Sequence, residues 1–284
     1  MGFFIGILNG LGVAFQNNRF KALSVIHPHI LNWFRFLIGA AVLAIVISLF
    51  GAWQMPSKQI WFILLFLSLP IEALNAFCYI RSFQYSPQSL VGPLYAFSII
   101  LLVPLGYFFL HETPSLIGFL GILLVIIGTV SIGWDIRDPG VRRSLKNIFK
   151  ERGSLYMLSA ALLSAFTVII SKYSYKYIPP LNFAFYITLA LALFYTPIVI
   201  RMGIGDSKNH MRSLIAMNAT YGIDTCLHYI GLSFLPAVYY ISVKRSSLLF
   251  DVILGKFVYK EGYFKERIFG ASIMMGGLLC IALA

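Results

Sequence analysis

The chain has 284 residues, of which 59% are hydrophobic and only 11% are charged. Soluble domains carry about 25% charged residues, so this composition excludes a water-soluble globule and places the chain in a lipid bilayer. The formal net charge of +12 does not indicate a nucleic-acid partner, because the basic residues sit in short connections and form no compact basic domain.

Apolar segments of about 20 residues, the length that spans a bilayer, follow one another along the whole chain. They predict an all-α integral membrane protein, with ten transmembrane helices in two inverted five-helix repeats, in a cell inner or plasma membrane. The first segment contains Asn9 and has no basic region before it, so it is interpreted as a span and not as a signal peptide. The predicted spans are 2–17, 28–50, 60–82, 87–110, 115–134, 154–173, 181–201, 213–234, 237–259 and 266–284.

The two halves of the chain repeat one another. Residues 87–133 match the sequence 149 positions further on, so that Glu112 corresponds to Glu261, and a block at an offset of 151 pairs Lys21 with Lys172. Duplicated halves are typical of secondary transporters. We therefore expect a first five-span repeat at 1–134, a basic linker at 135–153 that lies on an anionic membrane surface, and a second repeat at 154–284.

Ionisable residues inside the spans are the candidates for function, because a charge at the bilayer centre needs a partner, a cavity or a task. In the third span, Glu72, Asn75 and Tyr79 are spaced i, i+3, i+7 and share one helical face. Pro70, just before them, should loosen the helix and free backbone carbonyls. This polar stripe is predicted to line a substrate cavity.

The eighth span carries the corresponding stripe. At the 149 offset Asn75 maps onto Asp224, Tyr79 onto His228, and Glu72 onto Tyr221. In an inverted repeat the two stripes would converge near the midplane, where transport sites lie. The alternative is that Asp224 and His228, at i and i+4, only satisfy one another.

The ninth span contains Lys244 and Arg245 near its centre, and Lys244, Ser247 and Asp251 are spaced as if on one helical face. Lys244 and Arg245 point about 100° apart on a helix, so one is expected to face the cavity while the other packs or pairs elsewhere. Glu72 and Asp224 are candidate partners of Lys244, and so is an anionic group on a substrate.

Further candidates lie in the first half and at the span boundaries. Arg35 in the second span could neutralise Glu72 or reach the substrate, and Tyr95 in the fourth span maps onto Lys244. Glu112 and Glu261 follow the fourth and ninth spans, where each would either cap the next helix or act in gating or coupling. Asp251, Glu72 and Asp224 complete the candidates for coupling or gating.

No cofactor or metal site is expected. Cys78, Cys226 and Cys280 are widely spaced within spans and give neither a metal-ligand pattern nor a disulfide framework. The sequence contains no HExxH, GxSxG or phosphate-cradling glycine loop, so we expect no enzyme. Expected partners are a small-molecule substrate and membrane lipids, with the protein a monomer or a homodimer joined through its glycine-rich spans.

The ends of the two fourth spans read FLHE and VYKE, and glycine-rich fifth spans follow them, GFLGILLVIIGTVSI and FGASIMMGGLLCIAL. With PHILNWFRFLIGA in the second span, these segments resemble the EamA-like members of the drug/metabolite transporter superfamily. The resemblance covers nearly the whole chain. It implies ten spans, inverted repeats, a central cavity and alternating access, with both termini in the cytoplasm. The basic connections instead favour both termini outside, so the orientation stays open.

The leading hypothesis is a secondary transporter, an exporter or exchanger, of a small polar metabolite. The mixture of carboxylates and cations suits an amino acid or an organic anion, with proton coupling through Glu72 or Asp224 as one option and simple exchange as another. The alternatives are an intramembrane enzyme that acts on a lipid or isoprenoid, and a receptor or scaffold without transport. The sequence fixes neither the substrate nor the direction of transport.

Overall fold

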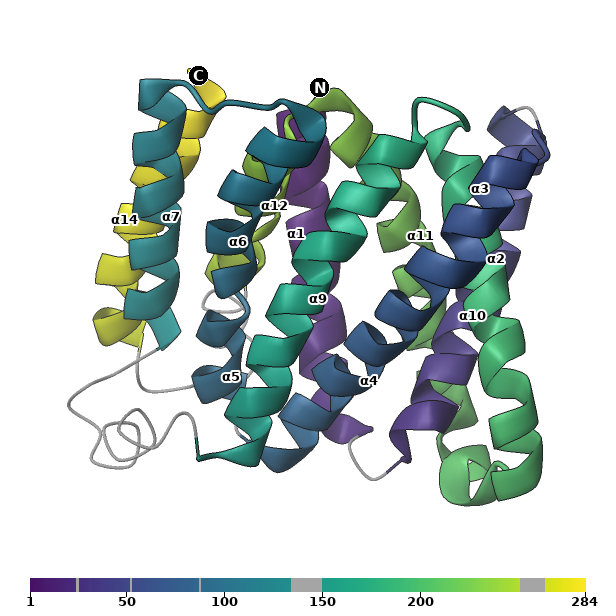
Figure 1. The fold of residues 1–284 in the computed structure, drawn as a ribbon. Helices are drawn as coiled ribbons and strands as arrows, with labels where there is room; N and C mark the ends of the chain where they lie inside the picture. Colours follow the sequence, from purple (N-terminus) through teal and green to yellow (C-terminus); the bar gives the residue numbers. More distant parts are fainter. Residues whose placement is uncertain (24–25, 52, 87, 134–149, 251–263) are drawn as a thin grey trace.

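The computed structural model describes residues 1–23, 26–51, 53–86, 88–133, 150–250 and 264–284. These residues form helices and connections and contain no strand (Figure 1). The first half contributes α1 (Gly2–Ala22), α2 (Pro28–Phe50), α3 (Lys58–Phe62), α4 (Leu69–Tyr85), α5 (Gln88–Leu94), α6 (Phe97–Leu105) and α7 (Leu116–Gly133). The second half contributes α9 (Arg152–Ser174), α10 (Pro180–Met202), α11 (Met211–Phe234), α12 (Ala237–Lys244) and α14 (Phe264–Ala282).

Local sequence sets several helix starts. Pro28 and Pro180 stand in the first turns of α2 and α10, where a missing N–H costs nothing and the fixed φ favours a helix. Ser57 caps α3, since its side chain accepts a hydrogen bond from the Ile60 N–H at 3.3 Å.

Five helical segments in the described part of the chain are long and apolar enough to cross a membrane. They are Pro28–Phe50, Lys58–Tyr85, Val91–Leu110, Arg152–Ser174 and Pro180–Met202. Three shorter apolar helical stretches are Gly2–Gln16, Leu116–Ser131 and Phe269–Ala282. The chain is an all-helical, multi-pass integral membrane protein, as predicted, while the number of ten spans stays a prediction.

Two of the spans contain a π-helical turn beside a proline. Ile63–Ser68 forms such a turn between α3 and α4, directly before Pro70, and Gly106–Leu110 forms another after Pro104. Proline cannot donate the helical hydrogen bond, and a π turn is a common way to absorb the resulting mismatch. The expected loosening of the third span before Glu72 is therefore present.

The helices of one half pack mainly against those of the other. Helix α4 lies along α9 and α1 lies along α11, while α6 contacts α9 and α12 contacts α1. Two further extensive contacts, α2 with α10 and α7 with α14, also join the two halves. Each contact therefore has a counterpart in which the halves exchange roles, as expected from a duplicated unit.

The counterparts run in opposite directions. In Figure 1, α1 starts at the end of the bundle that carries both termini and runs away from it, whereas α9 runs toward that end. We call it the termini end. Because the two halves pack against each other in opposite directions, their shared interface lies at the centre of the molecule.

Candidate functional site

A central cavity of about 190 Å³ lies between the two halves. Helices α1, α2, α4 and α5 contribute from the first half, and α9, α11 and α12 contribute from the second. All nine residues that the sequence predicted for substrate binding line this cavity: Arg35, Glu72, Asn75, Tyr79, Tyr95, Asp224, His228, Lys244 and Arg245. The structure thus brings them together, while their role in binding stays a prediction.

The two polar stripes face the same cavity, α4 with Glu72, Asn75 and Tyr79, and α11 with Asp224 and His228. Asp224 and His228 do not satisfy one another, because each has another partner. Two hydrogen bonds from Asn9 hold Asp224, and Lys244 donates to His228. The stripe on α11 is therefore tied to α1 and α12, and not closed on itself.

The side chains of Lys244 and Arg245 point in different directions, as their helical spacing predicts. Lys244 Nζ lies 3.4 Å from His228 Nδ1 at the cavity wall. Arg245 turns toward the first half, where its Nη2 donates to the Tyr95 carbonyl at 3.0 Å and to Ser98 Oγ at 2.8 Å. Its guanidinium also lies 4.3 Å from the centre of the Tyr95 ring. Arg245 thus joins the halves, while Lys244 stays on the second half, beside His228 at the cavity wall.

In the described part of the chain, Lys244 forms no ion pair within 4.0 Å of Glu72 or Asp224. Glu72 and Asp224, two of the candidate partners of Lys244, are therefore not in direct ion-pair contact with it in this conformation, and their pairing with Lys244 stays a prediction. Lys244 instead contacts His228 on the adjacent α11, the helix that also carries Asp224. A cavity that holds separated charges of both signs can satisfy them with a charged ligand.

The fourth and ninth spans are both interrupted at the cavity. Between α5 and α6, the N–H groups of Tyr95 and Ala96 bond three residues back, to Gly92 and Pro93. After α12, the N–H groups of Arg245 and Ser246 likewise bond to Ser242 and Val243. Broken helices at corresponding places in two repeats mark the binding sites of many transporters.

The interrupted helices correct two expectations, the repeat partner of Tyr95 and the shared helical face of Lys244 and Ser247. Tyr95 corresponds structurally to Arg245, one position further than the 149 offset indicates, because the same three-residue turn occurs at both. The helix also does not continue from Lys244 through Ser247, so these residues do not share an uninterrupted helical face, although both line the cavity. Asp251 lies outside the described residues.

Arg35 stacks on Tyr221, with its guanidinium carbon 4.1 Å from the ring centre. The contact joins α2 to α11 and keeps the cation at the cavity wall. Arg35 and Glu72 line the same cavity, and the neutralisation of Glu72 by Arg35 stays a prediction.

Glu112 does not line the cavity. It forms an ion pair with Lys172, with Glu112 Oε1 and Lys172 Nζ 2.5 Å apart, at the termini end of α9. Glu261 lies outside the described residues. Among those residues, no group of three or more His, Cys, Asp or Glu could hold a metal ion.

Sequence reasoning missed Asn9 and Tyr240. Asn9 is fully buried and donates to Asp224, while its own oxygen accepts a hydrogen bond from Tyr240 at 2.9 Å. The available signal was an amide in the middle of the first predicted span, three residues before Gly12. A Cβ at Gly12 would lie 2.5 Å from Asp224 Oδ1, so this glycine allows α1 to approach the site.

The profile of the EamA-like transporter family matches residues 1–134 and 151–283. The chain belongs to the EamA-like transporter family. A curated relative from Sinorhizobium sp, an "Uncharacterized transporter in cobO 3'region", is 29% identical over 125 residues, which are 42% of this chain and 79% of that protein. A solved structure described as "Crystal structure of protein" matches with a TM-score of 0.77 at 15% identity, over 99% of this chain and 97% of that chain. At this identity the solved structure supports the fold of the EamA-like chain alone.

Proposed function

We propose that this EamA-like protein is a secondary transporter that moves a small polar metabolite, an amino acid or an organic anion, by alternating access. The observation that carries the proposal is a central cavity, built from both halves, that holds two carboxylates and three cations. Charges are costly inside a membrane and are kept there for substrate or ion pathways. Membership of a transporter family favours transport over intramembrane catalysis.

The charge arrangement supports a ligand with an anionic group. Lys244 reaches only His228 among the described hydrogen-bond partners, and Arg35 stacks on an aromatic ring at the same cavity. A carboxylate of the ligand would bind between these cations, and an ammonium group would bind near Glu72 or Asp224. The cavity of about 190 Å³ is smaller than the pockets of about 300–1,000 Å³ that bind drug-sized ligands, which favours a small metabolite.

The interrupted fourth and ninth spans support alternating access at this place. At each break a tight turn replaces regular helix at the cavity wall. Arg245, at one break, contacts Tyr95 at the other. A contact between the halves at the broken segments would couple a rearrangement of one half to the conformation of the other. Exchange and proton-coupled transport both fit this arrangement.

The test is flux into proteoliposomes of purified protein, with pooled radiolabelled amino acids, organic anions, sugars and nucleosides, with and without a pH gradient. We expect flux for an amino-acid or organic-anion pool and its loss in Lys244→Ala. Lys58→Ala, which removes an exposed lysine outside the cavity, is the matched control and should transport normally. Flux of a neutral sugar alone, or flux unchanged by Lys244→Ala, would contradict the proposed substrate class.

A further inference from the structure

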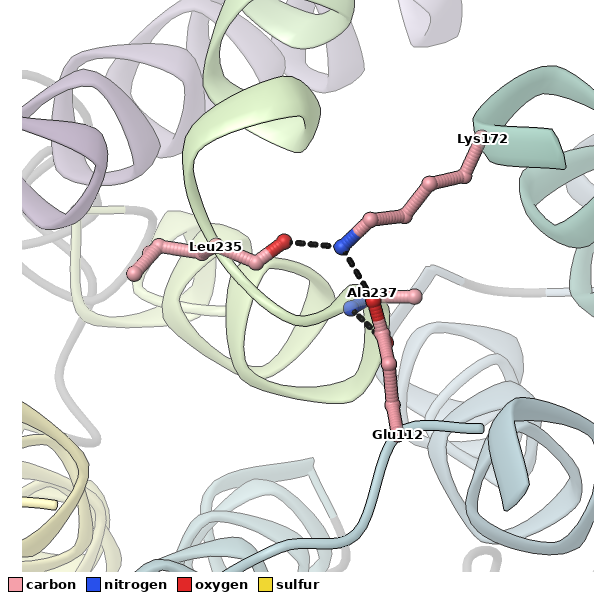
Figure 2. Close-up of polar contacts among 4 residues, drawn as sticks. All are labelled: Glu112, Lys172, Leu235 and Ala237. Carbon is pink, nitrogen blue, oxygen red and sulfur yellow. Dashed lines mark hydrogen bonds and ion pairs between the residues drawn. The ribbon is translucent and has the colours of Figure 1, made fainter. Parts of the chain in front are cut away.

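The termini end of the bundle is closed by contacts between segments that are far apart in sequence. The connection before α7 meets the connection between α11 and α12, and the end of α9 lies beside both (Figure 2). The first of these segments belongs to one half and the other two belong to the second half. Contacts here therefore hold the halves together at one end of the central cavity.

Glu112 and Lys172 lie at the centre of this closure. Besides the ion pair, Glu112 Oε2 accepts a hydrogen bond from the Ala237 N–H at 2.7 Å, and Lys172 Nζ donates to the Leu235 carbonyl. Figure 2 shows both charged side chains converging on the segment from Leu235 to Ala237. Their side chains are only 18% and 16% exposed, so the pair is shielded and stronger than a surface salt bridge.

Glu112 caps a helix of the other half and not the helix that follows it. Ala237 is the first residue of α12, and its N–H is one of the groups that a helix start leaves without an internal partner. The sequence favoured a cap of the next span, α7, but Ser115 performs that task through a hydrogen bond from the Gly118 N–H at 3.1 Å. This cap exists only while the halves touch at the termini end.

Tyr239 adds a second contact across the same boundary. Its hydroxyl accepts a hydrogen bond from the Ser115 N–H at 2.8 Å, so the start of α7 is fixed to α12. The connection before α7 is itself held in an unusual shape, since His111 has a φ of 56°. Such a left-handed non-glycine residue is uncommon, and here it turns the chain so that Glu112 enters the closure.

The closure lies directly beyond the cavity. On α9 the cavity wall runs from Met157 to Ser171, and Lys172 is the next residue toward the termini end. On α12 the first cavity residue is Ile241, one turn after Ala237. In the other direction the wall continues to Phe83 and Gly92, near the opposite end of the bundle. The Glu112–Lys172 pair therefore lies between the cavity and the termini end along α9 and α12.

We propose that Glu112 and Lys172 form the gate at the termini end of the central cavity, and that this structure is the conformation closed at that end. Opening separates the ion pair and, with it, the cap on α12 and the bond to Leu235. This inference rests on the proposed transport function. The repeat also gives Lys21 and Glu261 as the sequence equivalents of Lys172 and Glu112, as expected if each half supplies one member of such a pair.

The test measures the width of the termini end directly and without substrate. Spin labels are placed on Leu116→Cys and Ser233→Cys, two exposed positions on α7 and α11, after replacement of the three native cysteines. Double electron–electron resonance in nanodiscs then gives the distance distribution. We expect one dominant population in the otherwise unchanged protein, and a longer-distance population in Glu112→Gln and in Lys172→Met.

The ratio of open to closed molecules should rise roughly tenfold in each variant, the effect expected for loss of one charged hydrogen bond. Glu151→Gln is the matched control, because Glu151 accepts a hydrogen bond from Ser86 at the opposite end of α9. It should not lengthen the distance at the termini end. If Glu112→Gln does not fold, Lys172→Met carries the test.

Two results would overturn the gate. One is a distance distribution in Lys172→Met and Glu112→Gln that superposes on that of the parent protein. The other is the same lengthening in Glu151→Gln, which would mean general loosening of the bundle. A failure of the proposed function is separate, since it would show as absent flux in proteoliposomes while the distances still respond to the gate variants.

Discussion

Asn9 and Asp224 meet across the boundary between the two halves of the chain. The Asn9 amide donates to Asp224 Oδ1 at 2.5 Å and to the Asp224 backbone oxygen at 2.9 Å, while Tyr240 donates to the Asn9 oxygen. One side chain of α1 thereby uses both its donors and its acceptor to fix α11 and α12. The carboxylate of Asp224 therefore has a set position in the cavity wall.

Asn9→Ala is expected to destabilise the protein, because it leaves buried groups on Asp224 and Tyr240 without their partner. Each such group costs about 1–3 kcal/mol. The measurement is the thermal unfolding midpoint of purified protein in detergent. Asn218→Ala is the control: Asn218 is equally buried on α11, but neither of its side-chain polar atoms has a hydrogen-bond partner among the described residues. Equal losses in the two variants would contradict the role of Asn9.

Gly12→Ala should disturb the same contact by steric means. The added Cβ would lie 2.5 Å from Asp224 Oδ1 and 3.1 Å from Asp224 Cγ, so either Asp224 or α1 must move. We expect a lower unfolding midpoint and weaker flux. Gly276→Ala on α14 is the control, because a Cβ there meets nothing within 4 Å, and alanine favours a helix over glycine by about 0.5–1 kcal/mol. A Gly12→Ala protein as stable as Gly276→Ala would refute the close approach.

The sequence predicted the fold and the location of the polar stripes well, because both depend on regular helical spacing and on an internal repeat. Glu72, Asn75 and Tyr79 share a face through that spacing, and the repeat finds their counterparts on α11. The sequence could not show which of Lys244 and Arg245 faces the cavity and which pairs elsewhere. Which of the two turns to the first half depends on the helix break at Arg245, and that break has no proline or glycine to announce it.

The sequence left Glu112 undecided between capping of the next helix and a role in gating or coupling, and it gave no partner for the carboxylate. Local spacing suggests capping of α7, and only the packing of α9 and α12 against the first half brings Lys172 and Ala237 to the carboxylate. Asn9 was missed for the same reason. Its contacts lie more than 200 residues away in sequence, where no periodicity reports them.

Lys244→Ala and Arg245→Ala should differ in kind. Lys244→Ala is expected to abolish flux of an anionic substrate while leaving the unfolding midpoint nearly unchanged, since Lys244 has one long hydrogen bond to His228. Arg245→Ala should lower the midpoint, because it removes the stacking on Tyr95 and two hydrogen bonds, one to the turn between α5 and α6 and one to α6. Unfolding and flux are measured on the same preparations. The assignment fails if Lys244→Ala destabilises the protein as much as Arg245→Ala does.

His27, which caps α2, predicts a pH dependence of stability. Its Nδ1 accepts a hydrogen bond from the His29 N–H at 3.4 Å, which requires a neutral ring. Burial, and next the charge of Arg81, lower the pKa of His27 below its usual 6.5. The neutral His27 cap therefore contributes to the stability of the folded protein above pH 6.5, and this contribution is lost as the pH falls through the lowered pKa of His27.

His27→Asn keeps a cap acceptor without titrating. We expect the unfolding midpoint of the parent protein to fall more steeply than that of His27→Asn as the pH is lowered from 7 toward 5. The difference between the two profiles isolates His27 from the other titrating groups. Parallel profiles would remove His27 as a source of the pH dependence.

Glu72 and Asp224 should have separable roles in transport. Asp224 is held by Asn9, so Asp224→Asn is expected to lower stability and flux together. Glu72 has Arg35 and Lys244 as electrostatic neighbours, and its protonation would change the balance of charge that a substrate meets. Glu72→Gln removes this titratable group, so the charge at this position no longer changes with pH. We expect that flux in this variant no longer responds to an imposed pH gradient but persists as exchange. If Glu72→Gln keeps the full response of the parent protein to the gradient, proton coupling does not pass through Glu72.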